Sequence, residues 1–255
     1  MQRYNWGNTF NTRDLGYTPT VTGKYIKFQR FIRSDAPCKI EDGVKDFLIE
    51  KDVKTVIDLR NKNIVKINPN AFAGDVRFST YNFPLSVDPK VAKSEEDVIE
   101  NYYKMIENDK AIFQIFHTMA NSDGGILFHC QEGKDRTGVI SALLLLLGDV
   151  ADIDIIADYE ISNAYLYQMT QIAKNAPGGI PAFLLYIKSE YMDAVLAYLR
   201  DKYGTIENYL LKKGILQIEI EILKRKLLEK ILLMDDSLAG SEGVYLFAKF
   251  IPVLC

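Results

Sequence analysis

One stretch near the middle of the chain constrains the fold more than any other. Residues 125–128 form a short apolar run that is typical of a buried strand, and residues 130–136 form a polar loop that contains a glycine. Residues 137–147 are mostly apolar, and Gly148 follows them as a helix stop. The sequence therefore predicts a strand, a tight loop and a buried helix in direct succession.

Such a succession creates a site for an anion. The loop amides can point inward at the start of the helix, where the helix dipole adds partial positive charge. Cys130 opens the loop, and positive charge around it favours the thiolate, the reactive form of cysteine. Arg136 follows after five intervening residues, and its planar guanidinium can bind two oxygens of one phosphate. The spacing predicts a loop that wraps a phosphate while sulfur attacks phosphorus.

The spelling of this loop resembles that of a known superfamily. From residue 129 to residue 138 it reads His-Cys-x-x-Gly-Lys-Asp-Arg-Thr-Gly, which is similar to the protein tyrosine phosphatase superfamily. The likeness is to the bacterial and fungal tyrosine/serine branch, which has reported lipid-phosphate activity. Four further segments are similar to motifs of that branch: residues 11–16, 33–35, 58–60 and 158–163.

The chain also departs from the pattern of this branch. Thr12 stands where an aromatic residue is usual, and Tyr17 replaces a second glycine. After the Asp-Leu-Arg of residues 58–60 the branch usually continues with Ser and Glu, whereas residues 61–66 read Asn-Lys-Asn-Ile-Val-Lys.

The resemblance implies a hydrolase that cleaves phosphomonoesters through a cysteinyl-phosphate intermediate. Its substrates would be phosphotyrosine and, with dual specificity or lipid activity, phosphoserine/threonine or phosphoinositides. Cys130 would be the nucleophile, while Arg136 and the loop amides stabilise the equatorial oxygens. Thr137 can donate to the sulfur, and His129 would order the loop through its backbone. We expect no metal and no cofactor, because Arg136 and the amides take the place of a cation.

The leaving oxygen needs a proton, which a positioned acid supplies with an effect of about 10²–10⁴-fold. Asp135 is the first candidate because it lies inside the loop beside Arg136. Asp58 and Asp88 are the alternatives.

The other side chains of the loop should surround the substrate. We expect substrate binding by Gln131, Glu132, Gly133, Lys134 and Thr137. Lys134 either adds positive charge that suits a second phosphate or is simply solvated. Glu132 would repel a phosphate if it pointed inward, so we expect it to point outward and to pair with Lys134 or another cation.

Three residues outside the loop have structural alternatives. Arg33 can reach the phosphate pocket or form a structural salt bridge. For Asp58 we favour a structural role over catalysis: it would pair with Arg60 and support the loop. We interpret His117 as a packing or surface residue.

The order of the predicted elements favours an α/β fold. A mainly parallel central sheet would be flanked by helices, as in the phosphatases, and the C-terminal half would be helical. Such sheets bind ligands at the carboxyl ends of their strands, where the Cys130 loop lies. The predicted strands are 24–33, 54–60, 76–85 and 125–128, and the main predicted helices are 40–51, 95–106, 110–120, 137–147, 189–203, 205–213 and 218–233.

We expect one phosphatase domain over residues 1–233, followed by a tail of residues 234–255. Residues 150–215 would form a helical lid or subdomain. The Pro- and Gly-rich break at residues 176–181 is either the edge of a mobile lid or a plain surface loop.

Composition narrows the remaining classes. A formal net charge of -3 gives no basic face for nucleic acid. The three cysteines, Cys38, Cys130 and Cys255, form no disulfide framework, which favours a cytoplasmic location. Residues 1–6 lack the apolar core of a signal peptide. A longer natural chain could still carry such a signal, so secretion is not excluded. The longest apolar run, 142–147, is too short for a membrane span.

Two other classes of function are possible for such a loop. A catalytically weak pseudophosphatase module would hold a phosphorylated ligand without turnover; the intact Cys130 and Arg136 disfavour it, whereas Glu132 weakly favours it. Sulfur or arsenate chemistry would need a second nearby cysteine, which the sequence lacks.

Overall fold

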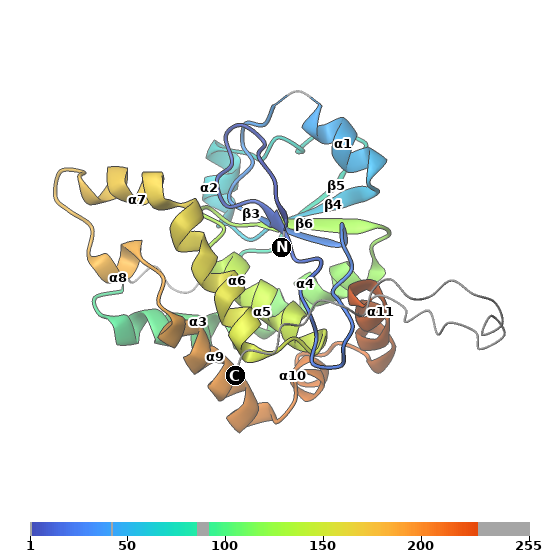
Figure 1. The fold of residues 1–255 in the computed structure, drawn as a ribbon. Helices are drawn as coiled ribbons and strands as arrows, with labels where there is room; N and C mark the ends of the chain where they lie inside the picture. The colour runs from blue at the N-terminus through green and yellow to red at the C-terminus, as the bar shows by residue number, and fades with distance from the viewer. Residues whose placement is uncertain (1, 42, 86–91, 229–255) are drawn as a thin grey trace, which may run out of the picture.

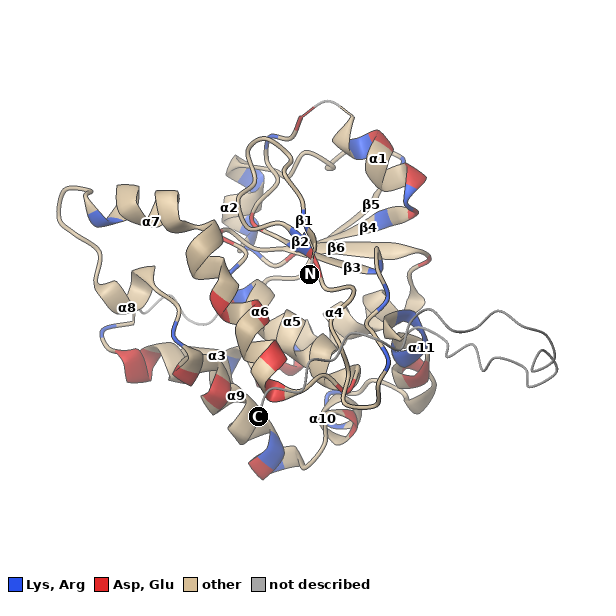
Figure 2. Ribbon diagram, viewed as in Figure 1, with Lys and Arg blue, Asp and Glu red and all other residues tan. Residues whose placement is uncertain are grey.

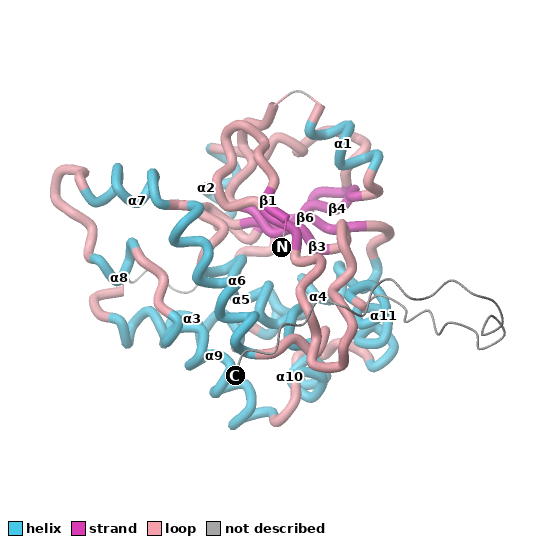
Figure 3. The backbone as a smooth tube through the Cα atoms, viewed as in Figure 1, coloured by secondary structure: helices cyan, strands magenta, loops and turns pink. Residues whose placement is uncertain are grey.

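A single sheet lies at the centre of the molecule. The computed structural model describes residues 2–41, 43–85 and 92–228, and within them six strands pair in the order β1-β2-β3-β6-β4-β5. Figure 3 shows the strands in magenta, with helices on both sides of them. Their bounds are Gln2–Arg3 (β1), Arg13–Asp14 (β2), Phe31–Ser34 (β3), Val53–Asp58 (β4), Ser79–Asn82 (β5) and Gly125–His129 (β6). The strands from β3 to β5 are parallel, and β1 and β2 add antiparallel at one edge. The predicted α/β class with a mainly parallel sheet is confirmed.

The parallel strands end together at one edge of the sheet. Ser34 and Asp58 are both in register with His129, the last residue of β6, and Asn82 is in register with Asp58. The chain that leaves β6 therefore emerges between the ends of β3 and β4. This is the edge at which α/β sheets bind ligands.

Helices cover both faces of the sheet (Figure 1). One face packs on α1 (Val44–Glu50), and α2 (Lys62–Ile67) follows β4 on the same side. The opposite face is covered by the larger group of helices: α3 (Glu95–Ile106), α4 (Asp109–Asn121), α5 (Asp135–Leu147), α6 (Asp152–Tyr165), α9 (Ser189–Tyr203), α10 (Ile206–Lys212) and α11 (Gln217–Leu227). Leu127 packs toward α1 and its neighbours Ile126 and Phe128 pack toward the larger group, as alternation along a strand requires.

The central helix of the larger layer is α5. Nearly all of its residues are buried, including the run from Val139 to Leu145. A helix that is apolar on every side is stable only when protein surrounds it. This burial fixes the start of α5 directly beyond the carboxyl end of β6.

The two helices α7 (Tyr167–Lys174) and α8 (Ala182–Leu185) project beyond these layers (Figure 1). The predicted lid spanned residues 150–215. However, α6 and α9 contribute Ile155, Tyr159, Val195 and Leu196 to the main core. The part that projects is therefore shorter than the range predicted for a lid or subdomain.

Two predicted strands are longer than the observed ones. The prediction of a strand or hairpin over 24–33 is right only for β3, because Gln29 has a positive φ of 59° and the chain turns there. The prediction over 76–85 is right only for β5, because a turn closed by Phe78 N and Asp75 O at 3.0 Å precedes it.

The helices match their predictions more closely. The observed α9 has the predicted bounds, and Ser94 Oγ accepts a hydrogen bond from Asp97 N at 3.3 Å as the predicted cap of α3. The first helix starts late, at Val44, since Gly43 takes a left-handed φ of 85°. The short α2 was not predicted. The α11 helix ends at Leu227, and the part of its prediction beyond residue 228, like the tail, lies outside the described residues.

The structure also bears on insertion into a bilayer. Within the described ranges, none of the helices combines the length and the apolar character that a membrane span needs.

Candidate functional site

The loop after β6 is closely fitted to the end of β3. Cys130 follows the strand and is 2% exposed. Gly133 has a φ of 67°, and a Cβ there would lie 2.5 Å from Asp35 N and 2.6 Å from the carbonyl carbon of Ser34. Only glycine fits this left-handed conformation and close approach without strain. The predicted internal glycine of the loop therefore has a geometric reason.

Donors from outside hold three consecutive carbonyls of the loop. Ala36 N donates to Gln131 O at 3.1 Å, and Asn11 Nδ2 donates to Glu132 O at 3.0 Å. Arg33 NH2 donates to Gly133 O at 2.7 Å.

These outward carbonyls orient the amides of the loop. In a trans peptide the N–H points opposite to the C=O, so the next amide along the chain faces the interior of the loop each time. The amides of residues 131–134 donate to no acceptor in the part of the chain that the structure describes. The loop thus presents a set of free donors beside a helix N-terminus, which is suited to an anion.

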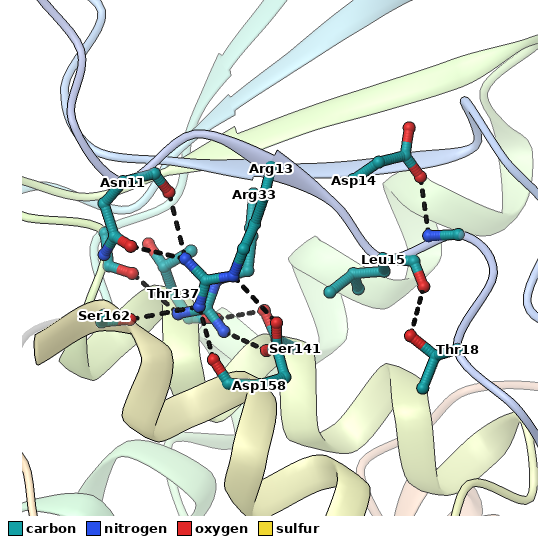
Figure 4. Close-up of polar contacts among 12 residues, drawn as sticks. Asn11, Arg13, Asp14, Leu15, Thr18, Arg33, Thr137, Ser141, Asp158 and Ser162 are labelled. Atoms are coloured by element: carbon teal, nitrogen blue, oxygen red, sulfur yellow. Dashed lines mark hydrogen bonds and ion pairs between the residues drawn. The ribbon is translucent and has the colours of Figure 1, made fainter. Parts of the chain in front are cut away.

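Arg33 is one end of a buried ion network (Figure 4). It pairs with Asp158 of α6, which also pairs with Arg13 at 2.9 Å, and Arg13 NH2 donates to Ser162 Oγ at 3.1 Å. Burial opposes ionisation of Asp158, but the two guanidiniums outweigh it and hold the pKa of this carboxyl below its ordinary value. Burial and the neighbouring Arg33 lower the pKa of Arg13 to about 10. Of the two alternatives for Arg33, the structure shows the salt bridge.

Asp58 is also committed to a structural pair. Arg60 binds it with Nε at 2.9 Å and NH2 at 2.7 Å, and Asn70 Nδ2 lies 3.4 Å away. Despite burial, the hydrogen bonds and the positive charge of Arg60 keep the pKa of Asp58 below its ordinary value. A buried, bidentate carboxylate of this kind is a poor proton donor, and Asp88, the other alternative, lies outside the described residues.

His129 contacts the backbone of the cysteine. Its Nδ1 lies 3.1 Å from Cys130 O, so the ring must carry its proton on Nδ1 to donate there. The other nitrogen, Nε2, then faces Asp58 Oδ2 at 3.4 Å as an acceptor and forms no hydrogen bond among the described residues. Burial lowers the pKa of His129 to about 4, which keeps the ring neutral. The arrangement agrees with the expected ordering of the loop.

Asp135 belongs to the first turn of α5, because the helix starts two residues earlier than the sequence indicated. Its Oδ1 accepts a hydrogen bond from Tyr102 OH at 2.5 Å, and Tyr102 OH lies 2.7 Å from Tyr159 OH. Burial and the charge of Asp135 raise the pKa of both phenols well above the ordinary value, so they remain donors. The Asp135 side chain is 37% exposed. It is therefore both oriented and accessible.

This pair of tyrosines was not predicted from the sequence. Residue 102 lies in a predicted helix, 95–106, and residue 159 lies in a family-like segment, 158–163, but neither range alone indicates that the two hydroxyls meet. The available signal was chemical: a tyrosine at a buried helix position needs a partner for its hydroxyl.

Arg136 and Thr137 differ from these residues because they have no partner. The Arg136 side chain is half-buried and forms no hydrogen bond or ion pair with any described residue. Thr137 Oγ1 is buried and likewise lacks a partner among the described residues. Both lie in the first turn of α5, next to the free amides of the loop.

Lys134 and Glu132 pair with each other. Lys134 Nζ lies 3.2 Å from Glu132 Oε2, and Glu132 is 58% exposed, as expected for an outward carboxylate. Lys134 itself is buried rather than solvated, and Nζ donates to Leu184 O of α8 at 2.7 Å. Burial opposes its charge, but Asp135 and Glu132 raise the pKa of Lys134 above the ordinary value. In this conformation the amino group is already bound.

The chain is similar to several known proteins. A model of the "Tyrosine phosphatase family" matches residues 4–229. A tyrosine-protein phosphatase of Nostoc commune is 30% identical over 230 residues, which cover 82% of this chain and 78% of the relative. A protein of Cupriavidus necator, provisionally named a tyrosine-protein phosphatase, is 28% identical over 84% of each chain. The crystal structure of P. aeruginosa TpbA aligns with 16% identity over 78% of this chain and 97% of its own, with a TM-score of 0.37.

Proposed function

The chain belongs to the tyrosine phosphatase family, whose members are cysteine-dependent phosphatases, and from that premise we propose that residues 129–138 are its catalytic loop. One observation carries this assignment. Arg136 is half-buried without a protein partner in the described part of the chain, in the first turn of a helix that begins beyond a buried cysteine. A cation left unpaired beside free amides is suited to a phosphate dianion.

The first chemical step forms a bond between sulfur and phosphorus. The Cys130 thiolate attacks phosphorus from the side opposite the ester oxygen, the P–O bond breaks, and the leaving oxygen takes a proton from Asp135. The hydrogen bond from Tyr102 fixes the carboxyl of Asp135, and its partial exposure gives a substrate access to it. Asp135 must be protonated when the substrate binds.

The second step breaks the bond between sulfur and phosphorus. Water attacks the phosphocysteine, Asp135 accepts a proton from it, inorganic phosphate leaves, and sulfur departs as a thiolate. The unpaired hydroxyl of Thr137 supports a role as donor to that thiolate. Thr137 donates to the thiolate in both steps, because the sulfur is negatively charged before it attacks and again after it leaves.

Electrostatic stabilisation carries the largest part of the rate. In the transition state, negative charge spreads over three equatorial oxygens, which Arg136 and the loop amides bind. The amides need not reorient, because hydrogen bonds already fix the outward carbonyls of the loop. His129 and Asp58 support the loop from behind as positioning residues. Removal of one such donor to a transition state typically costs about 10²–10³-fold in turnover.

Phosphotyrosine is the proposed principal substrate. A phenol is a better leaving group than an alkyl hydroxyl and depends less on the acid, so phosphoserine, phosphothreonine and phosphoinositides are slower candidates. A pseudophosphatase is disfavoured because Glu132, the residue that argued for one, is exposed and paired with Lys134.

Hydrolysis of an aryl phosphate tests this function. We expect the unaltered protein to release phosphate, vanadate to inhibit it, and Cys130→Ser to have no measurable turnover. Cys38→Ser is the matched control, because Cys38 is the other free cysteine of the described residues. An unaltered protein without turnover between about pH 5 and pH 8, or an active Cys130→Ser variant, would contradict the proposal.

A further inference from the structure

A cavity of about 300 Å³ adjoins the catalytic loop. Its walls come from the loop side chains Glu132 and Lys134, from Asp35 at the end of β3, and from Met169 and Ala173 of α7. Neither Cys130 nor Arg136 lines it, so it is separate from the phosphate position. Its volume is at the lower end of the range of roughly 300–1,000 Å³ for small-molecule sites, which is enough for one large side chain.

The wall formed by the projecting helices is apolar. Leu166 and Met169 contribute from the α7 side and Leu184 and Leu185 from α8. Figure 2 shows few charged residues along these two helices. An apolar wall with a few polar groups on the facing side is the usual composition of a ligand site.

The facing wall is unfavourable for an anion. Asp35 is buried and accepts hydrogen bonds from Phe10 N at 2.9 Å and Asn11 N at 3.0 Å, and Glu132 is exposed at the rim. The one cation among the residues that line the cavity is Lys134, whose amino group already contacts Glu132 at 3.2 Å and Leu184 O at 2.7 Å. A second phosphate would meet two carboxylates and would have to displace both partners of Lys134.

The cavity also lies close to the reacting groups. Lys134 Nζ, on its wall, is 3.9 Å from Asp135 Oδ2, the proposed acid. A residue that flanks phosphotyrosine in a peptide can therefore reach the cavity while the phosphate occupies the loop.

We propose that this cavity is a specificity subsite for the side chain of a residue that flanks phosphotyrosine in a peptide. The side chain is apolar along its length, and its end is neutral or positively charged, as in leucine or lysine. An acidic flanking residue or a second phosphate is disfavoured there. The inference rests on the proposed phosphatase function and names its substrate class as phosphotyrosine peptides rather than phosphoinositides.

A panel of substrates tests the subsite on the unaltered protein. The panel holds phosphotyrosine peptides that differ only in Leu, Lys or Glu at the positions immediately before and after phosphotyrosine, together with an aryl phosphate and a bisphosphorylated inositol lipid. For at least one of the two positions we expect kcat/KM for the Leu and Lys peptides to exceed that for the Glu peptide by about tenfold or more. Equal values at both positions, or a faster reaction with the inositol lipid than with the Leu peptide, would overturn the proposal.

A pair of variants then locates the preference in the cavity. Ala173→Trp fills the cavity, and we expect the ratio between the Leu and Glu peptides to fall to about one while aryl phosphate turnover stays unchanged. Ile172→Trp is the matched control, because Ile172 neighbours Ala173 on α7 but is 68% exposed and does not line the cavity. If Ala173→Trp keeps the full preference for the Leu peptide over the Glu peptide, the preference does not arise in the cavity and the proposal is overturned. Loss of aryl phosphate hydrolysis in the unaltered protein would instead overturn the phosphatase function itself.

Discussion

The arginines behind the catalytic loop and the arginine within it illustrate two uses of the same side chain. Arg13, Arg33 and Arg60 are completely buried, and each binds a carboxylate of the protein. Arg136 is only half-buried and has no such partner among the described residues. The two groups therefore differ in whether the protein itself neutralises the charge.

This difference separates stability from binding. A buried guanidinium without a counter-ion costs several kcal/mol, so Arg33 and Arg13 depend on Asp158 for a stable fold. Arg136 is partly solvated and tolerates the lack of a partner, and for that reason its charge remains available for a phosphate. We expect changes in the first group to lower the free energy of unfolding and changes in the second to lower turnover.

The largest expected effect is on turnover, when the loop arginine is replaced. Arg136→Ala should lower kcat/KM for an aryl phosphate by about 10³-fold, equivalent to about 4 kcal/mol, because the equatorial oxygens lose a bidentate partner. Its free energy of unfolding should change by less than about 0.5 kcal/mol. Steady-state kinetics and urea unfolding on the same preparation check both parts. A strongly destabilised Arg136→Ala would show that Arg136 contributes to stability as the buried arginines do.

The next effect is on stability, when the buried network loses its acid. Asp158→Asn should lower the free energy of unfolding by about 3 kcal/mol, because two buried guanidiniums lose their counter-ion. Asp152→Asn is the matched control on the same helix, since its pair with Arg200 lies at the surface and is worth less than about 1 kcal/mol. If both variants lose the same free energy of unfolding, the buried network contributes no more to stability than a surface ion pair does.

The pH dependence of stability reports on His129, the neutral buried side chain beside Cys130. Burial lowers the pKa of His129 to about 4 from an ordinary value of 6.5, so the unfolded chain binds a proton at a higher pH than the native protein does. Stability from this residue is therefore complete above about pH 6.5 and is lost as the pH falls toward 4. Between pH 7.5 and pH 5 the loss should be about 2 kcal/mol.

A variant isolates this contribution. Between pH 7.5 and pH 5, the free energy of unfolding of His129→Asn should fall by about 2 kcal/mol less than that of the unaltered protein. Urea unfolding at the two pH values measures this difference. Burial raises the pKa of Asp14 to about 6 and gives the opposite slope in this window, but Asp14 is present in both proteins and cancels in the difference. An identical pH dependence of the two proteins would contradict a neutral, buried His129.

The smallest expected effect concerns the orientation of the acid. Tyr102→Phe removes the hydrogen bond to Asp135 and should lower kcat by about tenfold for an alkyl phosphate, with a smaller change for an aryl phosphate. Tyr103→Phe is the control on the next position of α3, where the hydroxyl has only a 3.5 Å contact with Ala194 O. A similar loss for both substrates would argue against orientation of the proton donor.

The sequence was sufficient for the parts of the structure that local pattern determines. The apolar run into Cys130, the glycine of the loop and the helix that follows are contiguous, and their order alone predicted a site at a strand end. The same holds for α9, whose periodicity and terminal Gly204 gave both ends of the helix.

Long-range pairing was beyond the sequence. Arg33 and Asp158 are separated by 125 positions, and no local pattern says whether this arginine binds a carboxylate or a phosphate. Lys134 was expected at the rim or in solvent, but α8 returns to it from residue 184 and buries it. Such contacts depend on how the projecting helices fold back toward the loop, and periodicity within a helix carries no information about that.

The most direct test of the comparison measures the binding of an oxyanion through its effect on stability. Vanadate at about a hundred times its dissociation constant should add about 2.7 kcal/mol to the free energy of unfolding of the unaltered protein. Arg136→Ala should be as stable as the unaltered protein without vanadate and should gain almost nothing when vanadate is added. Equal stabilisation of both proteins would contradict the claim that the unpaired arginine of the loop is the one that binds phosphate.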